Sequence, residues 1–352
     1  MTKQLDLSKA HIETNRLILR NFNNADLYDF HEYAREPGVG ELSGWRHHES
    51  IDESKRVIDM FICSKRVLAI ALKDSNRVIG SISIDYDSFR EPSNNSLFGV
   101  VIGYVLGKAY WHMGYMSEVL REIERYLFLD LEVDFIEASH YISNIRSQRL
   151  LVKRGYSIVK YFDYKTHFNT IERAILRIKY RKDYLATLEH VALYDSNLLP
   201  AGKWIYRGAR VPDGYYRGVV DIIIKNTRYD RYLVTKRDKN KESHPSKYEA
   251  TGGAISFNEK ENISAMREVY EETGIKLAED KLKFLYKTTL GSAVFFEYYA
   301  ECDCELDTVV LQKGETEEYH WLTREEYIKL FKSDLVAERQ KIRLARALEE
   351  FI

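Results

Sequence analysis

The chain has 352 residues, of which 45% are hydrophobic and 30% charged, and its formal net charge at pH 7 is −1. This length exceeds one typical core, so we expect two domains. The near-neutral charge argues against binding to nucleic acid or to an anionic membrane, and no apolar run approaches the roughly 18 residues of a membrane span. The first eight residues lack the apolar stretch of a secretory signal, so we expect a cytoplasmic protein.

The first half alternates between strand-like and helix-like runs. Hydrophobic periodicity predicts strands over 67–72, 78–84, 97–106, 136–141 and 174–179. It predicts helices over 117–129 and 143–154, and Gly155 should end the second of them. A charged segment follows at 179–183, so we divide the chain into an α/β domain over 1–183 and a second domain over 184–352.

The second half repeats the mixture of strands and helices. Strands are predicted over 215–225, 231–236, 282–290 and 293–300. Helices are predicted over 262–273, from about 323 and over 336–351. Cys302 and Cys304 have no second Cys or His pair at zinc-ligand spacing, so they are interpreted as free thiols on or beside a strand.

The most informative pattern lies between residues 253 and 275. Gly253 is followed by Glu259 and then by the run Arg-Glu-Val-Tyr-Glu-Glu-Thr-Gly-Ile over 267–275. Glu268, Glu271 and Glu272 stand at i, i+3 and i+4, so they share one face of a helix and repel one another. A divalent cation would neutralise this charge, and Mg²⁺ commonly joins carboxylates to substrate phosphates.

This spacing resembles the Nudix box, Gly-x5-Glu-x7-Arg-Glu-U-x-Glu-Glu-x-Gly-U, in which U is bulky and aliphatic, and every fixed position matches. The resemblance implies an α/β/α sandwich that hydrolyses a diphosphate with Mg²⁺ or Mn²⁺. Glu268, Glu271 and Glu272 would bind the ion, and Gly253 would let the backbone pass close to it. One of these glutamates, or a carboxylate on a later loop, would act as base. Arg267 is expected to point off the acidic face and to tether the helix or orient a glutamate.

Segments around the box resemble the Nudix branch related to isopentenyl diphosphate isomerase, namely 194–217, 233–237 and 245–253. Allylic isomerisation is therefore an alternative. The isomerases carry an essential cysteine where this chain has Gly252, and their box is degenerate after Arg-Glu. Hydrolysis of a nucleoside diphosphate linked to another moiety is thus favoured. Further candidates are Lys236 and Arg237 as phosphate contacts or solvated strand ends, and Glu297, Glu315 and Glu318 as an extra base or ligand or as surface acids.

In the first half, a strand that ends near Leu106 leads through a short loop to a helix that opens near Ser117. The amides at such a helix start bind phosphate oxygens. Gly114 in the loop allows close approach of the backbone. One glycine before a helix is weak evidence by itself, so the wider pattern decides the interpretation.

That wider pattern comprises 14–20, 44–50, 110–118, 144–147 and 155–156. It resembles the GCN5-related N-acetyltransferases (GNAT), in the branch that acetylates α-amino groups of ribosomal proteins, including alanine. The resemblance implies a mixed-sheet fold, acetyl-CoA as cofactor and an amine acceptor such as a protein N-terminus. It also implies that the cofactor pyrophosphate binds amides of Met113, Gly114, Tyr115, Met116 and Ser117, and that its pantetheine arm pairs with Tyr104, Val105 and Leu106.

The catalytic groups of this domain are less conventional. Asn144 and Ser147 belong to the motif near the cofactor thiol, and Ser147 is our candidate acid for the leaving thiolate. The positions of the usual family base and of the usual family tyrosine hold Val101 and Leu151. The ordinary pKa of histidine would allow His47 or His48 to act as the base; alternatively, both are ordinary surface histidines. We interpret the chain as a bifunctional enzyme; in the alternative, a non-catalytic CoA-binding domain regulates the hydrolase.

Overall fold

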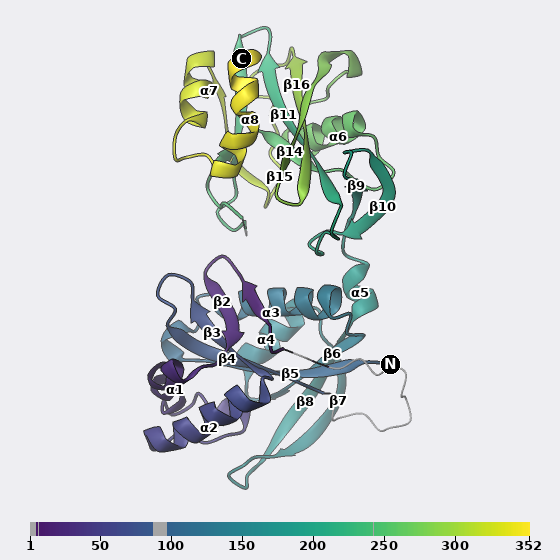
Figure 1. The fold of residues 1–352 in the computed structure, drawn as a ribbon. Coiled ribbons are helices and arrows are strands. Elements are labelled where there is room, and N and C mark those ends of the chain that lie inside the picture. The colour runs from purple at the N-terminus through teal and green to yellow at the C-terminus, as the bar shows by residue number, and fades with distance from the viewer. Residues whose placement is uncertain (1–4, 6, 87–96, 242) are drawn as a thin grey trace. The chain divides into compact units, whose positions relative to one another are not determined.

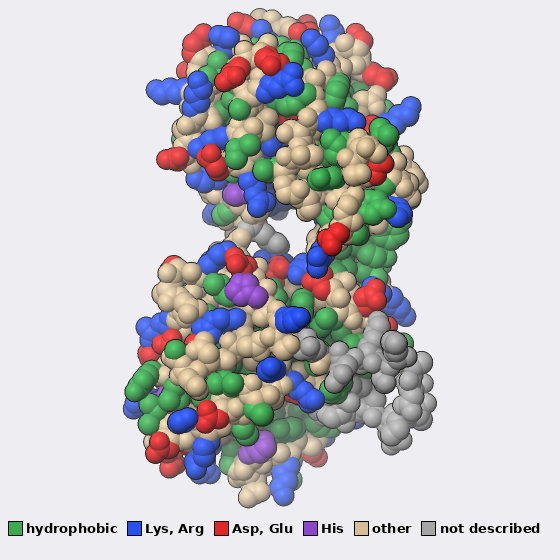
Figure 2. Space-filling model, in the orientation of Figure 1, with side chains coloured by type: hydrophobic (Ala, Val, Ile, Leu, Met, Phe, Trp, Pro, Cys, Tyr) green, Lys and Arg blue, Asp and Glu red, His purple; other side chains and the backbone are tan. Residues whose placement is uncertain are grey.

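The computed structural model describes residues 5, 7–86, 97–241 and 243–352. The chain divides into two compact units, Met1–Thr187 and Leu188–Ile352, which are drawn in Figure 1. The division expected after residue 183 falls within α5 (Arg181–Leu185) of the first unit. In the described part of the chain, no helix is both long and apolar enough to cross a membrane. Acidic and basic side chains intermingle on the face shown in Figure 2.

The first unit is built on an eight-stranded sheet in the order β1-β2-β3-β4-β5-β6-β8-β7, as traced through the described residues. Among the ladders of this sheet that the described residues form, only β5–β6 is parallel, and it runs from Gly99–Phe135 to Ile102–Ala138. The pairing stops at this point although β5 continues to Leu106, so the last residues of β5 have no ladder partner on β6 among the described residues and line a cavity there. The strands are β1 (His11–Glu13), β2 (Leu17–Asn21), β3 (Val67–Leu72), β4 (Val78–Tyr86), β5 (Gly99–Leu106), β6 (Phe135–Tyr141), β7 (Ser157–Lys165) and β8 (Ile171–Tyr180).

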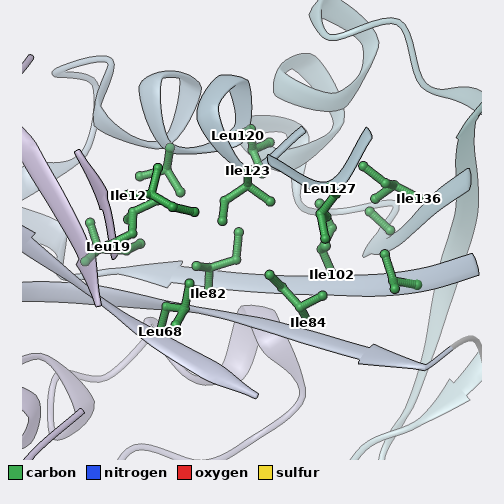
Figure 3. Packing of buried hydrophobic residues seen from close by; sticks show 14 of the residues in the cluster. Ile12, Leu19, Leu68, Ile82, Ile84, Ile102, Leu120, Ile123, Leu127 and Ile136 are labelled. Atoms are coloured by element: carbon green, nitrogen blue, oxygen red, sulfur yellow. The ribbon is translucent and has the colours of Figure 1, made fainter. Parts of the chain in front are cut away.

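Helices cover both faces of this sheet. Figure 1 shows α1 (Leu27–Ala34) and α2 (Ile51–Ser64) on one face, and α3 (Tyr115–Arg125) and α4 (Ile145–Lys153) on the other. The buried side chains of α3 and of the π-helical turn that follows it recur at helical spacing and pack onto isoleucines of β4 and β5, as Figure 3 shows for Leu120, Ile123, Leu127, Ile82, Ile84 and Ile102. Each such side chain contributes about 1.5–3 kcal/mol on burial.

The second unit is an α/β/α sandwich. Its sheet, nine-stranded over the residues described, pairs β11 with β16 in parallel and β11 with β14 antiparallel. Figure 1 shows α6 (Glu261–Thr273) on one face and α7 (Arg324–Phe331) and α8 (Glu338–Glu350) on the other. The strands are β9 (His190–Tyr194), β10 (Pro200–Tyr206), β11 (Tyr216–Asn226), β12 (Arg231–Arg237), β13 (Tyr248–Glu249), β14 (Thr251–Ala254), β15 (Leu282–Leu290), β16 (Ala293–Cys302) and β17 (Thr316–Leu322).

The two layers of this sandwich follow from the alternation of β11. Val220, Ile222 and Ile224 join the cluster that contains Ala265 and Val269 of α6. The intervening Ile223 joins the cluster of α7 and α8, with Tyr327, Phe331 and Leu344. A strand that is buried on both faces reads as a continuous apolar run, as β11 does. The mixed α/β class expected for both domains is confirmed.

Most predicted elements occur with small shifts at their ends. The strands predicted over 67–72 and 282–290 have those bounds in β3 and β15. The helix predicted over 117–129 begins earlier, at Tyr115, and its last turn, Tyr126–Asp130, is π-helical. Short 3₁₀ turns occupy Asn24–Asp26, Glu41–Ser43, Lys108–Tyr110 and Glu279–Lys281.

Candidate functional site

The acidic helix α6 lies directly against β14. It ends at Gly274, whose φ of 72° is the left-handed conformation of a helix C-terminus. A Cβ at Gly253 on β14 would lie 2.2 Å from Cδ of Glu268 and 2.3 and 2.4 Å from its two carboxylate oxygens. Only glycine permits this approach. The backbone of β14 and the Glu268 carboxylate therefore meet, as a shared metal and substrate site requires.

Arg267 lies on the acidic face, so the expectation that it points away is wrong. Its Nη1 donates to Oε1 of Glu268 at 2.8 Å and to Oε2 of Glu271 at 3.0 Å. Its Nε donates to Glu259 at 3.0 Å, and its Nη2 donates to the carbonyl of Ala254 at 3.2 Å. Residues 267 and 271 are one turn apart, so the same spacing that gathers the acids also brings the guanidinium to them.

Glu272 is the buried member of the acidic set. The residue is 9% exposed, and within the described residues its Oε2 has no hydrogen-bond partner. Burial raises its pKa well above the usual value, and the negative charges of Glu249 and Glu268 raise it further. A buried carboxylate oxygen without a donor is costly unless a cation pairs with it, and the amide of Gly252 offsets only part of that cost. The donor set therefore fits a hard divalent ion.

The three glutamates do not converge on one point in this structure. In the part of the chain that is described, no group of three or more His, Cys, Asp or Glu side chains is placed to hold a metal ion. Glu268 and Glu271 are instead drawn to the guanidinium of Arg267. This guanidinium stands where a cation would neutralise the acidic ridge, by which we mean Glu268, Glu271 and Glu272 of α6. It would have to release Glu268 and Glu271 for an ion to bind them.

Glu249 is a site residue that the sequence interpretation missed. Burial raises the pKa of Glu249 to about 7, against the opposing effect of Arg237, which donates to both of its oxygens at 2.9 Å. The negative charge of Glu249 raises the pKa of Glu272. No spacing rule links β13 to α6, so only the sequence Glu-Ala-Thr-Gly-Gly just before the box could have drawn attention to it.

The other acids named from the sequence separate in space. Glu315 adds negative charge near Glu272 while pairing with Lys241. Glu318 accepts from Lys236 at 3.0 Å and contacts His320 at 2.5 Å. Glu297 is fully buried on β16, where its register partner is Asp221. Lys236 and Arg237 are thus both paired with carboxylates, and of these acids only Glu315 bears on the acidic ridge.

The position of Gly252 decides against an isomerase cysteine. A Cβ there would lie 2.3 Å from the carbonyl oxygen of Val220 and 2.8 Å from Oδ1 of Asp221. Val220 belongs to the neighbouring strand β11, and its backbone cannot rotate out of the way. A cysteine at 252 would therefore force β11 and β14 apart.

The first unit has a cavity of about 330 Å³ at the gap beyond the β5–β6 ladder. It gathers most of the residues predicted to bind cofactor, and both residues predicted near the thiol. These lining residues are Tyr104, Val105, Leu106, Gly114, Tyr115, Met116, Ser117, Asn144 and Ser147. Met113 is not among the lining residues; its side chain is exposed. The cavity has the size of a small-molecule site.

The helix start at this cavity is held in place by Arg16, which the sequence interpretation did not single out. Gly114 has a φ of 81° and His112 has a φ of 63°, so the loop turns sharply before α3. Arg16 donates to the carbonyl of Met113 at 3.0 Å, lies 4.2 Å above the ring of Tyr115 and pairs with buried Glu118 at 2.7 Å. The first turn of α3, whose amides have no acceptor within the helix, therefore lies at the wall of the cavity.

Ser147 and Tyr104 form a hydroxyl pair across this cavity. The Tyr104 hydroxyl lies 2.9 Å from Oγ of Ser147, and Oδ1 of Asn144 accepts from the Ser147 amide at 3.2 Å. Burial raises the pKa of Tyr104 to about 12, so this phenol keeps its proton at neutral pH. Asn144 caps α4 and so fixes the position of Ser147.

The remaining candidates of this unit have structural partners. Leu151 is fully buried in the core. His48 is buried, its Nδ1 lies 2.8 Å from Oγ of Ser54, and burial lowers its pKa. His47 Nδ1 lies 2.7 Å from Oε1 of Glu41.

Comparisons with known proteins agree with this division. A family model described as an acetyltransferase (GNAT) domain matches residues 16–157, and one described as a NUDIX domain matches residues 215–344. The uncharacterized N-acetyltransferase YoaA of Bacillus subtilis (strain 168) is 28% identical over 150 residues, 41% of this chain and 81% of that protein. The uncharacterized Nudix hydrolase lmo0368 of Listeria monocytogenes is 32% identical over 144 residues, 40% of this chain and 82% of that protein.

Among solved structures, a GNAT-family acetyltransferase from Bacillus anthracis aligns at 20% identity and a TM-score of 0.43 over 49% of this chain and 99% of that chain. The Gly252–Gly253 approach to α6 and the cavity at the start of α3 lie within the two matched regions. The chain is an enzyme that belongs to the Nudix hydrolase family through its C-terminal domain and carries a GNAT acetyltransferase domain before it.

Proposed function

We propose that the C-terminal domain hydrolyses the pyrophosphate of a nucleoside diphosphate linked to another moiety, with Mg²⁺ or Mn²⁺. The observation that supports it most directly is Oε2 of Glu272, which is buried beside Glu268 and Glu249 and has no hydrogen-bond partner among the residues described. Such an oxygen is costly in the free protein and is satisfied when a divalent ion binds.

In this proposal Glu268, Glu271 and Glu272 hold the ion, and Gly253 brings the β14 backbone beside it. The bound ion would offset the charge of the diphosphate and acidify a water molecule. One of the three glutamates accepts the proton of the attacking water. When an ion binds, Arg267 would release Glu268 and Glu271. It would keep its hydrogen bonds to Glu259 and to the carbonyl of Ala254, so α6 would stay attached to β14.

We further propose that the N-terminal domain transfers an acetyl group from acetyl-CoA to an amine, with a protein N-terminus as the acceptor that the ribosomal-protein branch suggests. The amine nitrogen attacks the thioester carbonyl, the carbon–sulfur bond breaks, and the nitrogen releases its surplus proton to water, from which the hydroxyl pair regains the proton that it gives to the leaving group. The thiolate takes a proton from Ser147. Tyr104 then returns a proton to Ser147 through the hydrogen bond between their hydroxyls. We place this domain at 1–183 and the hydrolase at 184–352.

The hydrolase proposal is tested with a panel of nucleoside diphosphate derivatives and Mg²⁺, with products identified by mass spectrometry. Glu271→Gln and Glu272→Gln should each abolish turnover. Glu325→Gln, on the exposed first turn of α7, is the charge-matched control and should keep it. Full turnover in both box variants would refute the assignment, and formation of an allylic product from isopentenyl diphosphate would favour the isomerase instead.

The transferase proposal is tested by acetylation of amine and peptide panels. Ser147→Ala and Tyr104→Phe each remove one hydroxyl of the pair, and the double variant should lose more activity than either alone. Tight binding of acetyl-CoA without acetylation of any amine would instead favour the regulatory alternative. Robust acetylation would eliminate that alternative.

A further inference from the structure

A second cavity, of about 720 Å³, borders the hydrolase site at Gly253 and Ala254. It lies among β9, β10, the start of β11, the loop after β10 and the end of β12. Four arginines line it: Arg207, Arg210, Arg217 and Arg237. This volume is within the range that encloses a nucleotide-sized ligand and is much larger than a diphosphate group requires.

Three of these arginines already have an acidic partner. Arg207 donates to Glu189 at 2.7 Å. Arg210 lies 3.5 Å from Asp213. Arg237 donates to Glu249 at 2.9 Å. These pairs are internally balanced, so they leave no surplus charge in the cavity.

Arg217 is the exception. It is the second residue of β11, and over the described residues its guanidinium has neither an ion pair nor a hydrogen bond. Partial desolvation lowers its pKa, and the positive charges of Arg207, Arg343 and Arg339 lower it further. Asp221, the one acid that opposes this effect, is held by Arg343 at 2.6 Å.

The cavity and the acidic ridge are electrostatic neighbours. The charge of Arg207 reaches Glu268, where it opposes the rise in the pKa that burial causes. A ligand whose diphosphate lay at Glu268 and Gly253 could therefore extend into the cavity toward Arg217. A protein rarely keeps an uncompensated guanidinium among other arginines unless an anion joins it.

We propose that this cavity binds a phosphomonoester that the substrate carries in addition to the diphosphate that is cleaved. The inference rests on the proposed hydrolase function for its meaning, and it narrows the substrate to a nucleoside diphosphate derivative with a further phosphate. Arg217 supplies the free fork of donors that matches two phosphate oxygens. Arg207 and Arg237 also line the cavity. Their partners Glu189 and Glu249 repel anions at its edges, which favours a compact dianion placed at Arg217.

The test uses inorganic phosphate as the probe and the full chain in EDTA, because the cavity needs no metal and the diphosphate site does. Phosphorus NMR titration should show saturable binding. Arg217→Gln should weaken that binding at least tenfold, and Arg217→Lys should weaken it less. Arg346→Gln, an exposed arginine of α8 paired with Glu350, is the matched control and should bind as wild type does.

Two outcomes would overturn the proposal: no saturable binding by the wild type, or equal binding by Arg217→Gln. Glu272→Gln should leave phosphate binding in EDTA unchanged while it abolishes hydrolysis with Mg²⁺. A failure of the hydrolase proposal therefore shows in the turnover assay, and a failure of the phosphate site shows in the titration.

Discussion

A single methyl group at residue 253 should reduce the rate of hydrolysis about 100-fold and leave the fold nearly intact. In Gly253→Ala the new Cβ would lie 2.2 Å from Cδ of Glu268. Carbon atoms pack at about 3.5–4.0 Å, so the carboxylate must retreat by more than about 1 Å. A side chain can do this by rotating, at about 0.5–1.5 kcal/mol. Misplacing a catalytic group by that distance can reduce the rate about 100-fold.

Gly252→Ala is the matched comparison, because it adds the same methyl group one residue earlier. Its Cβ would lie 2.3 Å from the carbonyl oxygen of Val220, which is strand backbone and cannot rotate away. The β11–β14 pair must spread instead, and overpacking of this kind costs about 1–3 kcal/mol. We therefore expect the 252 variant to lose more stability than the 253 variant.

The assay pairs kcat/KM for hydrolysis with Mg²⁺ and urea unfolding in EDTA. Because the chain has two domains, unfolding is followed by hydrogen exchange in peptides from β11 and α6, which report the C-terminal domain alone. Wild-type turnover in Gly253→Ala would refute the reasoning. So would a loss of stability in Gly253→Ala equal to that in Gly252→Ala, since the Glu268 side chain would then be immobile.

Three further expectations follow. In EDTA at neutral pH, Glu272→Gln should raise the free energy of unfolding by about 1–3 kcal/mol, because burial disfavours the carboxylate and its Oε2 has no hydrogen-bond partner among the described residues; urea unfolding that shows no gain would contradict this. The stability of the metal-free protein should fall as pH rises from about 4.5 to about 7, because folding raises the pKa of Glu249 and the folded state holds its proton longer; Glu249→Gln should remove that part of the decline. Arg16→Ala should raise the KM for acetyl-CoA by about 10- to 100-fold with a smaller effect on kcat, because the loop before α3 loses its hold; an unchanged KM would show that the loop needs no clasp.

The longer elements of the fold could be predicted because their buried residues form continuous apolar runs or recur at helical spacing in the sequence. β3 and β11 are apolar runs, and α3 has helical spacing. β7 and β14 were missed for different reasons. β7 is a largely exposed edge strand in which hydrophobic and charged residues do not alternate regularly. β14 contains two glycines, which disfavour strands, and its conformation comes from pairing with β11.

The candidate sites divide in the same way. The acidic face of α6 followed from i, i+3 and i+4 spacing, and the turn at Gly114 followed from its place before a helix. The Tyr104–Ser147 pair joins β5 to α4, and the environment of Arg217, which has no ion pair among the described residues, is set by charged side chains on other elements. Contacts between residues far apart in the chain leave no periodic signal, so they became visible only in the folded structure.

Arg267 gives the hydrolase a competitor that is part of its own chain. An ion from solution that binds Glu268 and Glu271 must displace the guanidinium of Arg267. Because this guanidinium is tethered at the same place, its effective concentration is high. Weak ions, or strong ions at low concentration, will lose this competition. Half-maximal hydrolysis should therefore need a higher concentration of free magnesium than the carboxylates alone would require, and shortening residue 267 would lower that concentration.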